Sequence, residues 1–355
     1  MNKIEYYRKL KYPEYAKPHK NGLKNSYELL DLSVDDGQII SQKLLKILFD
    51  NKTIASKYVY SQDQELINLI SNYLKINKNN ILITSGSDGA LGVISKLLID
   101  KDTRVAIPVP SFGRFEFHAK INFGKISFFG TQKFPFDINL DKFLDYCKKR
   151  NIEVVYLANP NNPTGIYKSK DILEMFIKNF KGYIILDEAL ADYLGESSAN
   201  LVNIYSNLVV IKSFSKLFGL AGMRIGYIIA NRKIIKTLQT LVSPFEVNSL
   251  AIKLSIEVLN NRAQIIQERR EDLMKSLRII WKFKHNNFQF TPSQSSTVTL
   301  LSHQKNDVYE QLLSHKIRGV SGKDFRGLEK FNCVRLSIKN YQNVRKLLTI
   351  LNKFK

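Results

Sequence analysis

Short apolar runs and longer amphipathic stretches alternate along the middle of this chain, from about residue 80 to about residue 230. Apolar runs of this length, rich in β-branched residues, predict strands that are buried on both faces. The stretches between them have the spacing of amphipathic helices, so the pattern predicts an α/β fold with a mostly parallel sheet between helices. We predict seven strands, at 81–84, 104–107, 125–129, 154–157, 183–186, 208–211 and 225–229.

The pattern changes towards the carboxyl end of the chain. A long helical stretch covers 246–282, with a break near 260–261, and two apolar runs follow at 297–301 and 334–338. A last helix begins near Tyr341. These elements predict a second, smaller α+β unit.

Length and pattern together predict two domains. The chain has 355 residues, whereas one domain usually takes roughly 100–200 residues. The N-terminal residues show no clear alternation of strands and helices. We therefore predict an N-terminal segment over 1–44 that joins the small domain, a large cofactor-binding domain over 45–245 and a small domain over 246–355.

The composition excludes several classes of protein. Hydrophobic residues make up 44% of the chain and charged residues 24%, which are ordinary values for a globular protein and exclude intrinsic disorder. No apolar run approaches the ~18–20 residues of a membrane-spanning helix, and the first residues lack the apolar core of a signal peptide. We therefore expect a cytoplasmic protein with no membrane partner.

The formal net charge of +22 raises the question of an anionic partner. The positive surplus is spread along the chain, and no run of five or more Lys or Arg residues occurs. This distribution is typical of a biased overall composition, so we expect no nucleic-acid partner. Two isolated cysteines and five scattered histidines form no metal-binding motif, so we also expect no metal.

Ligands of parallel sheets bind at the carboxyl ends of the strands, so the polar residues after each predicted strand are candidates. The glycine-rich segment 85–89 follows the first strand and opens a helix, whose N–H groups can hold a phosphate. Phe112 follows the second strand. The sequence NPNNPTG at 159–165 follows the fourth strand and predicts a rigid, polar turn.

Three charged candidates follow the next strands. Asp187 ends the fifth apolar run, Lys216 follows the sixth in a setting of small and apolar residues, and Arg224 comes eight residues later. A lone aspartate is often a helix cap and a lone lysine is usually solvated, but these residues occur together along one sheet. Together they describe a site for a phosphorylated aromatic aldehyde, in which the lysine forms an imine, the aspartate binds a pyridinium nitrogen, and the arginine and backbone amides hold the phosphate.

These motifs resemble the fold type I pyridoxal-phosphate enzymes, specifically the histidinol-phosphate aminotransferase-like branch of the class I and II aminotransferases. The resemblance extends from about residue 58 to the end of the chain, and its most specific pieces are NPNNPTG (159–165), DEA (187–189) and SFSKLFGLAGMRIGY (213–227). It implies pyridoxal 5′-phosphate as cofactor. It also implies a transamination between a small-molecule amino donor and a keto acceptor, phosphorylated or not.

The resemblance implies a role for each matching residue. Lys216 would carry the cofactor as a Schiff base and later move the proton at the substrate Cα, while Asp187 would keep the pyridine nitrogen protonated. Asn162 would hydrogen-bond the phenolic O3′, and Phe112 would stack on the ring. The cofactor phosphate would be bound by Arg224, by Ser213 and Ser215, and by the backbone amides of Ser87 and Asp88.

Two further residues match the family outside these motifs. Tyr58 matches the tyrosine that reaches the cofactor phosphate of the partner subunit, which implies a homodimer. Arg335 matches the arginine that clamps the substrate α-carboxylate, for which a guanidinium fork is well suited.

Three positions depart from the family pattern. Leu190 stands where the family has a tyrosine that also bonds O3′, and the loss of this donor should raise the imine pKa. Gly89 replaces an acidic residue, and Lys57-Tyr58-Val59 replaces Arg-Tyr-Pro. None of these changes touches the lysine or the aspartate that the cofactor needs.

Two alternatives stay open at this point. The segment 324–328 is similar to one in threonine-phosphate decarboxylases, so decarboxylation of an O-phospho amino acid is the second hypothesis, and a non-catalytic binding module is the third. Arg318, Lys323 and Arg326 could form a second anion site for a phosphorylated substrate, or could equally be solvated surface charges.

Overall fold

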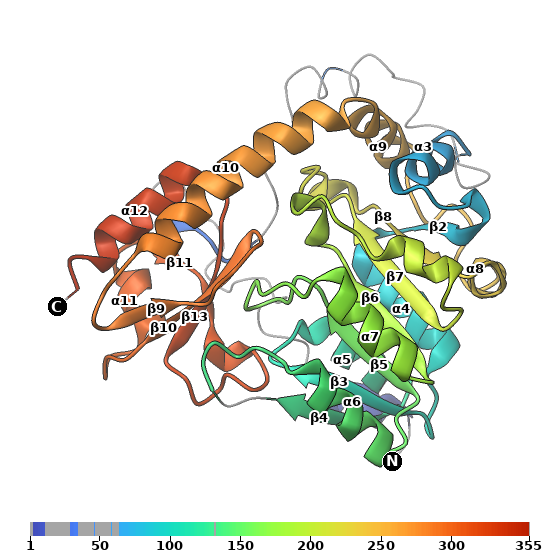
Figure 1. Ribbon diagram of the computed structural model, residues 1–355, viewed down its shortest axis with the longest axis horizontal. Coiled ribbons are helices and arrows are strands. Elements are labelled where there is room, and N and C mark those ends of the chain that lie inside the picture. Colours follow the sequence, from blue (N-terminus) through green and yellow to red (C-terminus); the bar gives the residue numbers. More distant parts are fainter. Residues whose placement is uncertain are drawn as a thin grey trace.

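The computed structural model describes residues 3–10, 29–34, 46, 58, 64–130 and 133–354. These residues form a large α/β unit and a smaller α+β unit, which lie on opposite sides of the molecule in Figure 1. The large unit is built on a seven-stranded sheet of order β2-β8-β7-β6-β5-β3-β4. Its strands are β2 (Ile81–Thr84), β3 (Arg104–Val109), β4 (Lys125–Gly130), β5 (Val154–Ala158), β6 (Tyr183–Asp187), β7 (Leu208–Ser213) and β8 (Gly226–Ala230).

All seven predicted strands are present, and the prediction of a mostly parallel sheet is confirmed. The strands from β7 to β4 run parallel to one another, whereas β8 runs antiparallel to both β7 and β2. β3 continues beyond its predicted end, because Pro108 and Val109 still pair with Phe129 and Gly130 of β4.

Alternate residues of each strand pack into two separate apolar layers. In β6, Ile184 and Leu186 face one layer and Ile185 faces the other. The layer of Ile185 is covered by α4 (Gly86–Leu98), α5 (Gly113–Ile121) and α8 (Arg232–Gln239). The opposite layer is covered by α3 (Gln64–Leu74), α6 (Leu140–Lys149) and α7 (Lys170–Asn179). Because both faces are buried, each strand needs apolar residues at nearly every position, which explains the continuous apolar runs.

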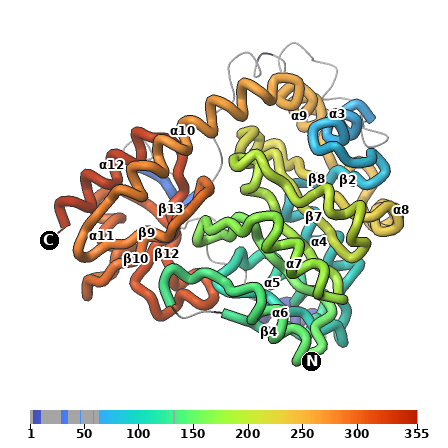
Figure 2. The backbone as a smooth tube through the Cα atoms, viewed as in Figure 1, coloured from blue at the N-terminus to red at the C-terminus, as the bar shows by residue number. Residues whose placement is uncertain are grey.

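The small unit holds a four-stranded antiparallel sheet of order β12-β13-β10-β9. Its elements are α10 (Arg262–Lys282), β9 (Phe288–Phe290), β10 (Thr297–Ser302), α11 (Val308–Ser314), β12 (Val320–Ser321), β13 (Cys333–Ser337) and α12 (Tyr341–Leu351). The predicted break in the long helical stretch is confirmed, because Asn261 separates α9 (Ser249–Asn260) from α10. In Figure 2 the chain crosses between the two units along α10.

Two short pieces of the N-terminal segment contact different units. β1 (Leu30–Asp31) pairs in parallel with β11 (Ile317–Arg318) of the small unit. α1 (Lys3–Lys9) lies against the large unit, where the Tyr6 ring stacks on Phe123 with the centroids 4.6 Å apart. The described parts of this segment touch both units, so the domain boundaries given above stay a prediction.

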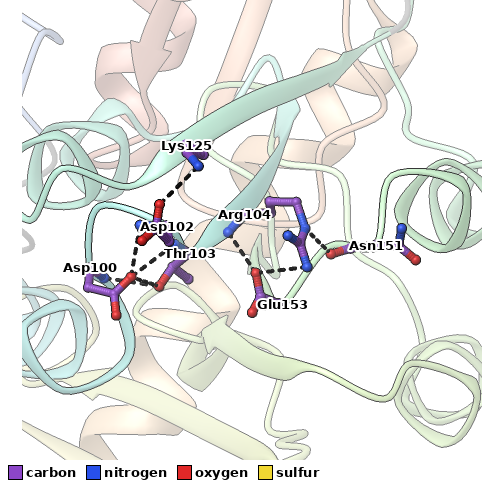
Figure 3. A network of polar contacts seen from close by, with 7 residues as sticks. All are labelled: Asp100, Asp102, Thr103, Arg104, Lys125, Asn151 and Glu153. Atoms are coloured by element: carbon purple, nitrogen blue, oxygen red, sulfur yellow. Dashed lines mark hydrogen bonds and ion pairs between the residues drawn. The ribbon is translucent and has the colours of Figure 1, made fainter.

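A surface network joins the amino ends of neighbouring strands (Figure 3). Arg104, the first residue of β3, lies 3.2 Å from the Glu153 carboxylate, which comes just before β5. Lys125, the first residue of β4, donates to Asp102 at 3.1 Å. These exposed pairs hold the edge of the sheet that lies opposite the carboxyl ends, and surface pairs of this kind contribute roughly 0–1 kcal/mol each.

The 159–165 turn of the large unit is clamped onto the small unit. Three hydrogen bonds join them: Thr299 Oγ1 to the Pro163 carbonyl (2.9 Å), Thr291 Oγ1 to the Thr164 carbonyl (2.7 Å) and the Gln294 N–H to the Gly165 carbonyl (2.9 Å). The two threonine side chains are fully buried, so these bonds are shielded from water. The turn is therefore fixed from both units.

The last residue of this turn requires glycine. Gly165 has φ +72°, and a Cβ at this position would overlap the Ser293 hydroxyl and the Thr297 carbonyl. We expect Gly165→Ala to lower the free energy of unfolding by about 2 kcal/mol or more, because the left-handed backbone costs alanine roughly 1–2 kcal/mol and the overlap adds to it. Urea unfolding measures the loss. Gly222→Ala is the control, since nothing lies within 4 Å of its added Cβ, and equal stability of both variants would contradict the clamp.

Candidate active site

The register of the large sheet gathers the predicted site residues at one edge. β8 begins where its neighbours end, so Gly226 pairs both with Thr84 at the end of β2 and with Ser213 at the end of β7. Asp187, the last residue of β6, pairs with Ala158 at the end of β5. The loops after these strands, and the loop that enters β8, therefore meet at the carboxyl edge.

Asp187 and Ser213 also share one face of the sheet. Each lies two residues after an isoleucine of the layer that α4, α5 and α8 cover, Ile185 in β6 and Ile211 in β7. Successive side chains of a strand alternate between faces, so both polar groups lie on the face that α4, α5 and α8 cover, at the edge of this layer. Lys212 points to the opposite face.

Asp187 is held in one orientation by two donors. The carboxylate is 6% exposed, its Oδ2 accepts the Tyr156 hydroxyl at 2.8 Å, and its Oδ1 accepts the Ala189 N–H at 3.0 Å. Burial raises the pKa of Asp187 above its usual value, and both hydrogen bonds and the Lys216 charge oppose that rise. A cationic partner beside a buried carboxylate of this kind favours its ionised form.

Lys216 lies in the loop after β7, beside two buried serines. The Ser213 Oγ accepts the Ser215 N–H at 3.1 Å, which bends the chain just before the lysine. The lysine side chain is half-buried, and its charge acts on Asp187. The structure therefore brings the predicted lysine and aspartate into one electrostatic environment.

The start of α4 forms a narrow cradle with the entry to β8. Gly86 has φ +76°, and a Cβ there would lie 2.9 Å from a guanidinium nitrogen of Arg224. A Cβ on Gly226 would lie 3.1 Å from the Ser87 backbone nitrogen. The arginine, the N–H groups of the first helical turn and the positive end of the helix dipole provide the features of an anion site.

The three asparagines of the 159–165 turn differ in the hydrogen bonds that the described part of the chain gives them. Asn159 bonds the backbone of Lys168 with both ends of its amide, and the Asn161 Nδ2 donates to the Pro110 carbonyl at 3.0 Å. The Asn162 Oδ1 is buried and has no hydrogen-bond partner among the described residues. The two ends of an amide exchange by rotation, so this side chain can present either a donor or an acceptor to a ligand.

The Asp88 carboxylate has a structural role that the sequence did not indicate. Arg114 binds it with two hydrogen bonds of 2.7 and 2.8 Å, and the His118 Nε2 lies 3.0 Å from its Oδ1. Burial alone would raise the pKa of Asp88, but the hydrogen bonds and charges of His118 and Arg114 outweigh burial and lower it far below its usual range. The backbone N–H of Asp88 is left as the group that can contact a phosphate.

The remaining predicted residues lie around this edge. Phe112 is half-buried and comes immediately before α5. The Tyr58 side chain is 70% exposed, and its ring centroid lies 4.8 Å from that of Phe245. Its sequence neighbours at 57 and 59 lie outside the described residues.

Arg335 reaches the site region through the small sheet. It lies in β13 directly opposite Thr299 of β10, and opposed residues of an antiparallel pair point to the same face. Its side chain therefore lies on the face from which Thr299 reaches the Pro163 carbonyl. Arg335 is 6% exposed, and its Nη1 donates to the Ser337 hydroxyl at 2.7 Å.

Several residues near the edge were missed in the sequence. Tyr156 bonds Asp187 from the middle of an apolar strand, and only its hydroxyl distinguishes it from a core residue. Glu246 accepts both the Ser85 N–H (3.0 Å) and its hydroxyl (2.5 Å), from a segment 161 positions away. The Glu246 carboxylate also lies beside Gly89, one of the three departures from the family pattern, at 3.1 Å from an added Cβ. Contacts at such separations have no local sequence signal.

The three cations that could form a second anion site are each close to a carboxylate. Arg326 binds Glu116 with two hydrogen bonds of 2.7 and 2.9 Å. Lys323 donates to Asp307 at 2.6 Å, and Arg318 lies 3.5 Å from Asp31. These ion pairs favour a structural role for the three cations over a second anion site.

Behind the site lies a buried ion network. Lys212 is fully buried, 2.8 Å from Asp192 and 3.4 Å from Glu188. Burial lowers the pKa of Lys212, but both carboxylates outweigh that effect and raise it. Leu190, which stands where the family has a tyrosine after Asp187-Glu188-Ala189, is also buried, at 6% exposure.

Within the described ranges, no three His, Cys, Asp or Glu side chains are grouped so that they could hold a metal ion. Burial raises the pKa of the Cys147 and Cys333 thiols to about 12. Among the helices that the structure describes, none has both the length and the apolarity to span a membrane.

The fold and this set of side chains define a fold type I pyridoxal-phosphate enzyme. Residues 32–351 match the family of class I and II aminotransferases. The histidinol-phosphate aminotransferase of Thermoanaerobacter pseudethanolicus is 31% identical over 266 residues, which cover 73% of each chain. The chain belongs to the class I and II aminotransferase family, and it is an aminotransferase that depends on pyridoxal 5′-phosphate.

Solved structures share this fold. The histidinol-phosphate aminotransferase from Clostridium acetobutylicum superposes with a TM-score of 0.80 at 24% identity, over 91% of this chain and 98% of that one. The L-threonine-O-3-phosphate decarboxylase from Porphyromonas gingivalis gives 0.77 at 21% identity, over 92% and 99%. Similarity at this level of identity shows the architecture alone.

The residues present fit the cofactor. An Asn162 amide that can be rotated to place its N–H donor at the buried, unpartnered end, a carboxylate buried against donors at Asp187, and a glycine-lined cradle beside Arg224 are the partners that a phenolic oxygen, a pyridinium nitrogen and a phosphate require. When bound, the cofactor supplies an electron sink for charge that develops at the substrate Cα.

The Asp88 carboxylate should make the protein sensitive to acid. Because its pKa is lowered in the folded state, its contribution to stability is present above the ordinary pKa of about 4 and is lost as the pH falls through the lowered value. We expect Asp88→Asn to remove this part of the pH dependence, so that its unfolding free energy falls less steeply below about pH 4. Urea unfolding at a series of pH values measures both slopes.

Asp102→Asn serves as the control for this experiment, because Asp102 is a surface carboxylate at the far edge of the sheet. Identical acid slopes for wild type and Asp88→Asn would show that Arg114 and His118 do not favour the ionised carboxylate.

Proposed function

We propose that this aminotransferase exchanges an amino group between an amino acid or phosphorylated amino compound and a keto acid or keto-phosphate. The observation that carries this proposal is the buried Asp187 carboxylate at the sheet edge, with the Lys216 charge acting on it. The similarity to histidinol-phosphate aminotransferases supports a phosphorylated amino compound as substrate.

Four side chains would act on the cofactor. The Lys216 amine would carry the cofactor and then move a proton at the substrate Cα. Asp187 would keep the ring nitrogen protonated, because an ionised carboxylate beside the nitrogen favours the pyridinium form. Asn162 would donate to the phenolic oxygen with its amide rotated, so that the nitrogen takes the buried position that has no partner among the described residues. Phe112 would stack on the ring.

The phosphate would lie in the cradle at the start of α4. Arg224 would supply charge, Ser213 and Ser215 hydroxyl groups, and Ser87 and Asp88 backbone N–H groups. The exposed Tyr58 would reach the cofactor phosphate of a partner subunit, so we propose a homodimer as the active form. We also propose that the enzyme works in the cytoplasm on small-molecule substrates.

Arg335 would bind the substrate α-carboxylate. Its place on the face of β13 that looks towards the 159–165 turn supports this role, because the same turn carries Asn162. A guanidinium fork can hold a carboxylate with two parallel hydrogen bonds and so orient the Cα–H bond.

Decarboxylation of an O-phospho amino acid is the second candidate. The turn that contains Arg326 packs against the end of β3, where a Cβ on Gly327 would lie 3.3 Å from Val109. This is the segment similar to threonine-phosphate decarboxylases, and a decarboxylase of this substrate class shares the fold. Leu190 also favours this candidate, since it departs from the aminotransferase pattern.

A screen of amino donors and phosphorylated amino acids tests both candidates. We expect purified protein to show the visible absorbance of bound cofactor, and an amino donor alone to convert it to the pyridoxamine form. We expect Lys216→Ala to lose the lysine-bound absorbance and turnover. Release of carbon dioxide from phosphothreonine or phosphoserine, with no conversion by any donor, would instead favour the decarboxylase, and full activity of Lys216→Ala would overturn both.

The carboxylate role of Arg335 has a separate test. We expect Arg335→Lys to raise KM for an amino-acid donor about tenfold to a hundredfold, because one fork of charge-assisted hydrogen bonds is lost, with a smaller change in kcat. A donor amine without a carboxylate should show no such change. Arg345→Lys, an exposed arginine on α12, is the control. A uniform loss for both kinds of donor would contradict carboxylate binding.

A further inference from the structure

We propose that Tyr156 is a positioning residue that keeps the Asp187 carboxylate ionised and aimed at the ring nitrogen of the cofactor. This inference rests on the proposed role of Asp187, and it adds a residue that would act through Asp187. The direct observation is the hydrogen bond from the Tyr156 hydroxyl to Asp187 Oδ2, 2.8 Å long and buried.

The sheet register brings the two residues together. Tyr156 pairs with Ile185 across β5 and β6, and Ala158 pairs with Asp187, so Tyr156 and Asp187 are diagonal neighbours. Both lie on the face covered by α4 and α5. Neighbouring strands lie ~4.8 Å apart and rise ~3.3 Å per residue, so such diagonal neighbours lie about 8 Å apart at Cα, a distance that a tyrosine side chain can span.

The Tyr156 ring cannot turn away from this contact at low cost. It is fully buried, and it stacks on Phe115 of α5 with the centroids 4.8 Å apart and an interplanar angle of 12°. The hydroxyl is therefore held at the end of a packed aromatic pair. A donor with fixed geometry orients its acceptor better than a mobile one.

The electrostatic effect of the tyrosine works against burial. Burial favours the neutral acid and raises the pKa of Asp187, whereas a donor to the carboxylate favours the ionised form. A neutral aspartic acid would leave the ring nitrogen without a counter-charge. Tyr156 opposes this change without adding a charge of its own, which the buried layer could not accommodate cheaply.

The test compares two ligands of the apoenzyme: pyridoxal 5′-phosphate and an analogue with carbon in place of the ring nitrogen. Only the first can pair its ring nitrogen with Asp187. We expect wild type to prefer pyridoxal 5′-phosphate and Tyr156→Phe, which keeps the stack on Phe115, to lose about tenfold of that preference. Tyr146→Phe is the matched control, because its hydroxyl donates to the Phe128 carbonyl away from the site.

A double-mutant cycle with Asp187→Asn separates positioning from folding. If Tyr156 acts through Asp187, the tyrosine substitution should change the ligand preference in wild type and leave it unchanged in Asp187→Asn. A structural defect would instead weaken both ligands equally in both backgrounds, and that result would overturn the inference. Failure of wild type to bind pyridoxal 5′-phosphate at all would overturn the proposed function itself.

Discussion

The register of β5, β6 and β7 is the constraint on which the candidate site depends. Both faces of these strands are buried, so their apolar residues fix which side each residue faces. A slip of one residue would send every side chain to the other face. At the site, a neighbouring residue would then take the place of Asp187, and Lys212 would take the place of Ser213. The partners of Lys212, Glu188 and Asp192, lie on the other face of the sheet. The packing of the core therefore determines the chemistry of the edge.

The clamp on the 159–165 turn extends this constraint to the small unit. Asn162 is in the middle of that turn, and the next three carbonyl groups are bonded by residues near or in β10. Arg335 faces the same turn from the neighbouring strand. The distance between a group that would hold the ring and a group that would hold the substrate is thus set by hydrogen bonds to the main-chain carbonyls of the turn. A rigid link of this kind suits a reaction that depends on the orientation of one Cα bond.

Much of the fold and the motif residues could be predicted from the sequence, because both have local signals. Apolar runs predict the strands. The NPNNPTG motif and the small and apolar residues around Lys216 are signals of the same kind, because each is formed by residues that are adjacent in the chain. The partners that tune these groups could not be predicted. Tyr156 has the periodicity of a core residue, and Glu246 meets Ser85 only through the tertiary fold. The tyrosine missing at Leu190 was visible in the sequence, but the buried setting of Leu190 was not.

The charges near the site explain why the surplus of +22 gives little guidance about the substrate. Arg326 precedes Gly327, whose added Cβ would contact Val109 at the end of β3. Its guanidinium is held by Glu116 and by the face of Phe128, 4.2 Å from the ring centroid. Its pKa is raised mainly by the hydrogen bond to Glu116. A substrate phosphate would have to compete with this bidentate carboxylate, although a dianion can offer a stronger attraction than a monoanion. Selectivity for a phosphorylated substrate at this position would therefore depend on exchange of Glu116 for the ligand, and not on the number of positive charges on the surface.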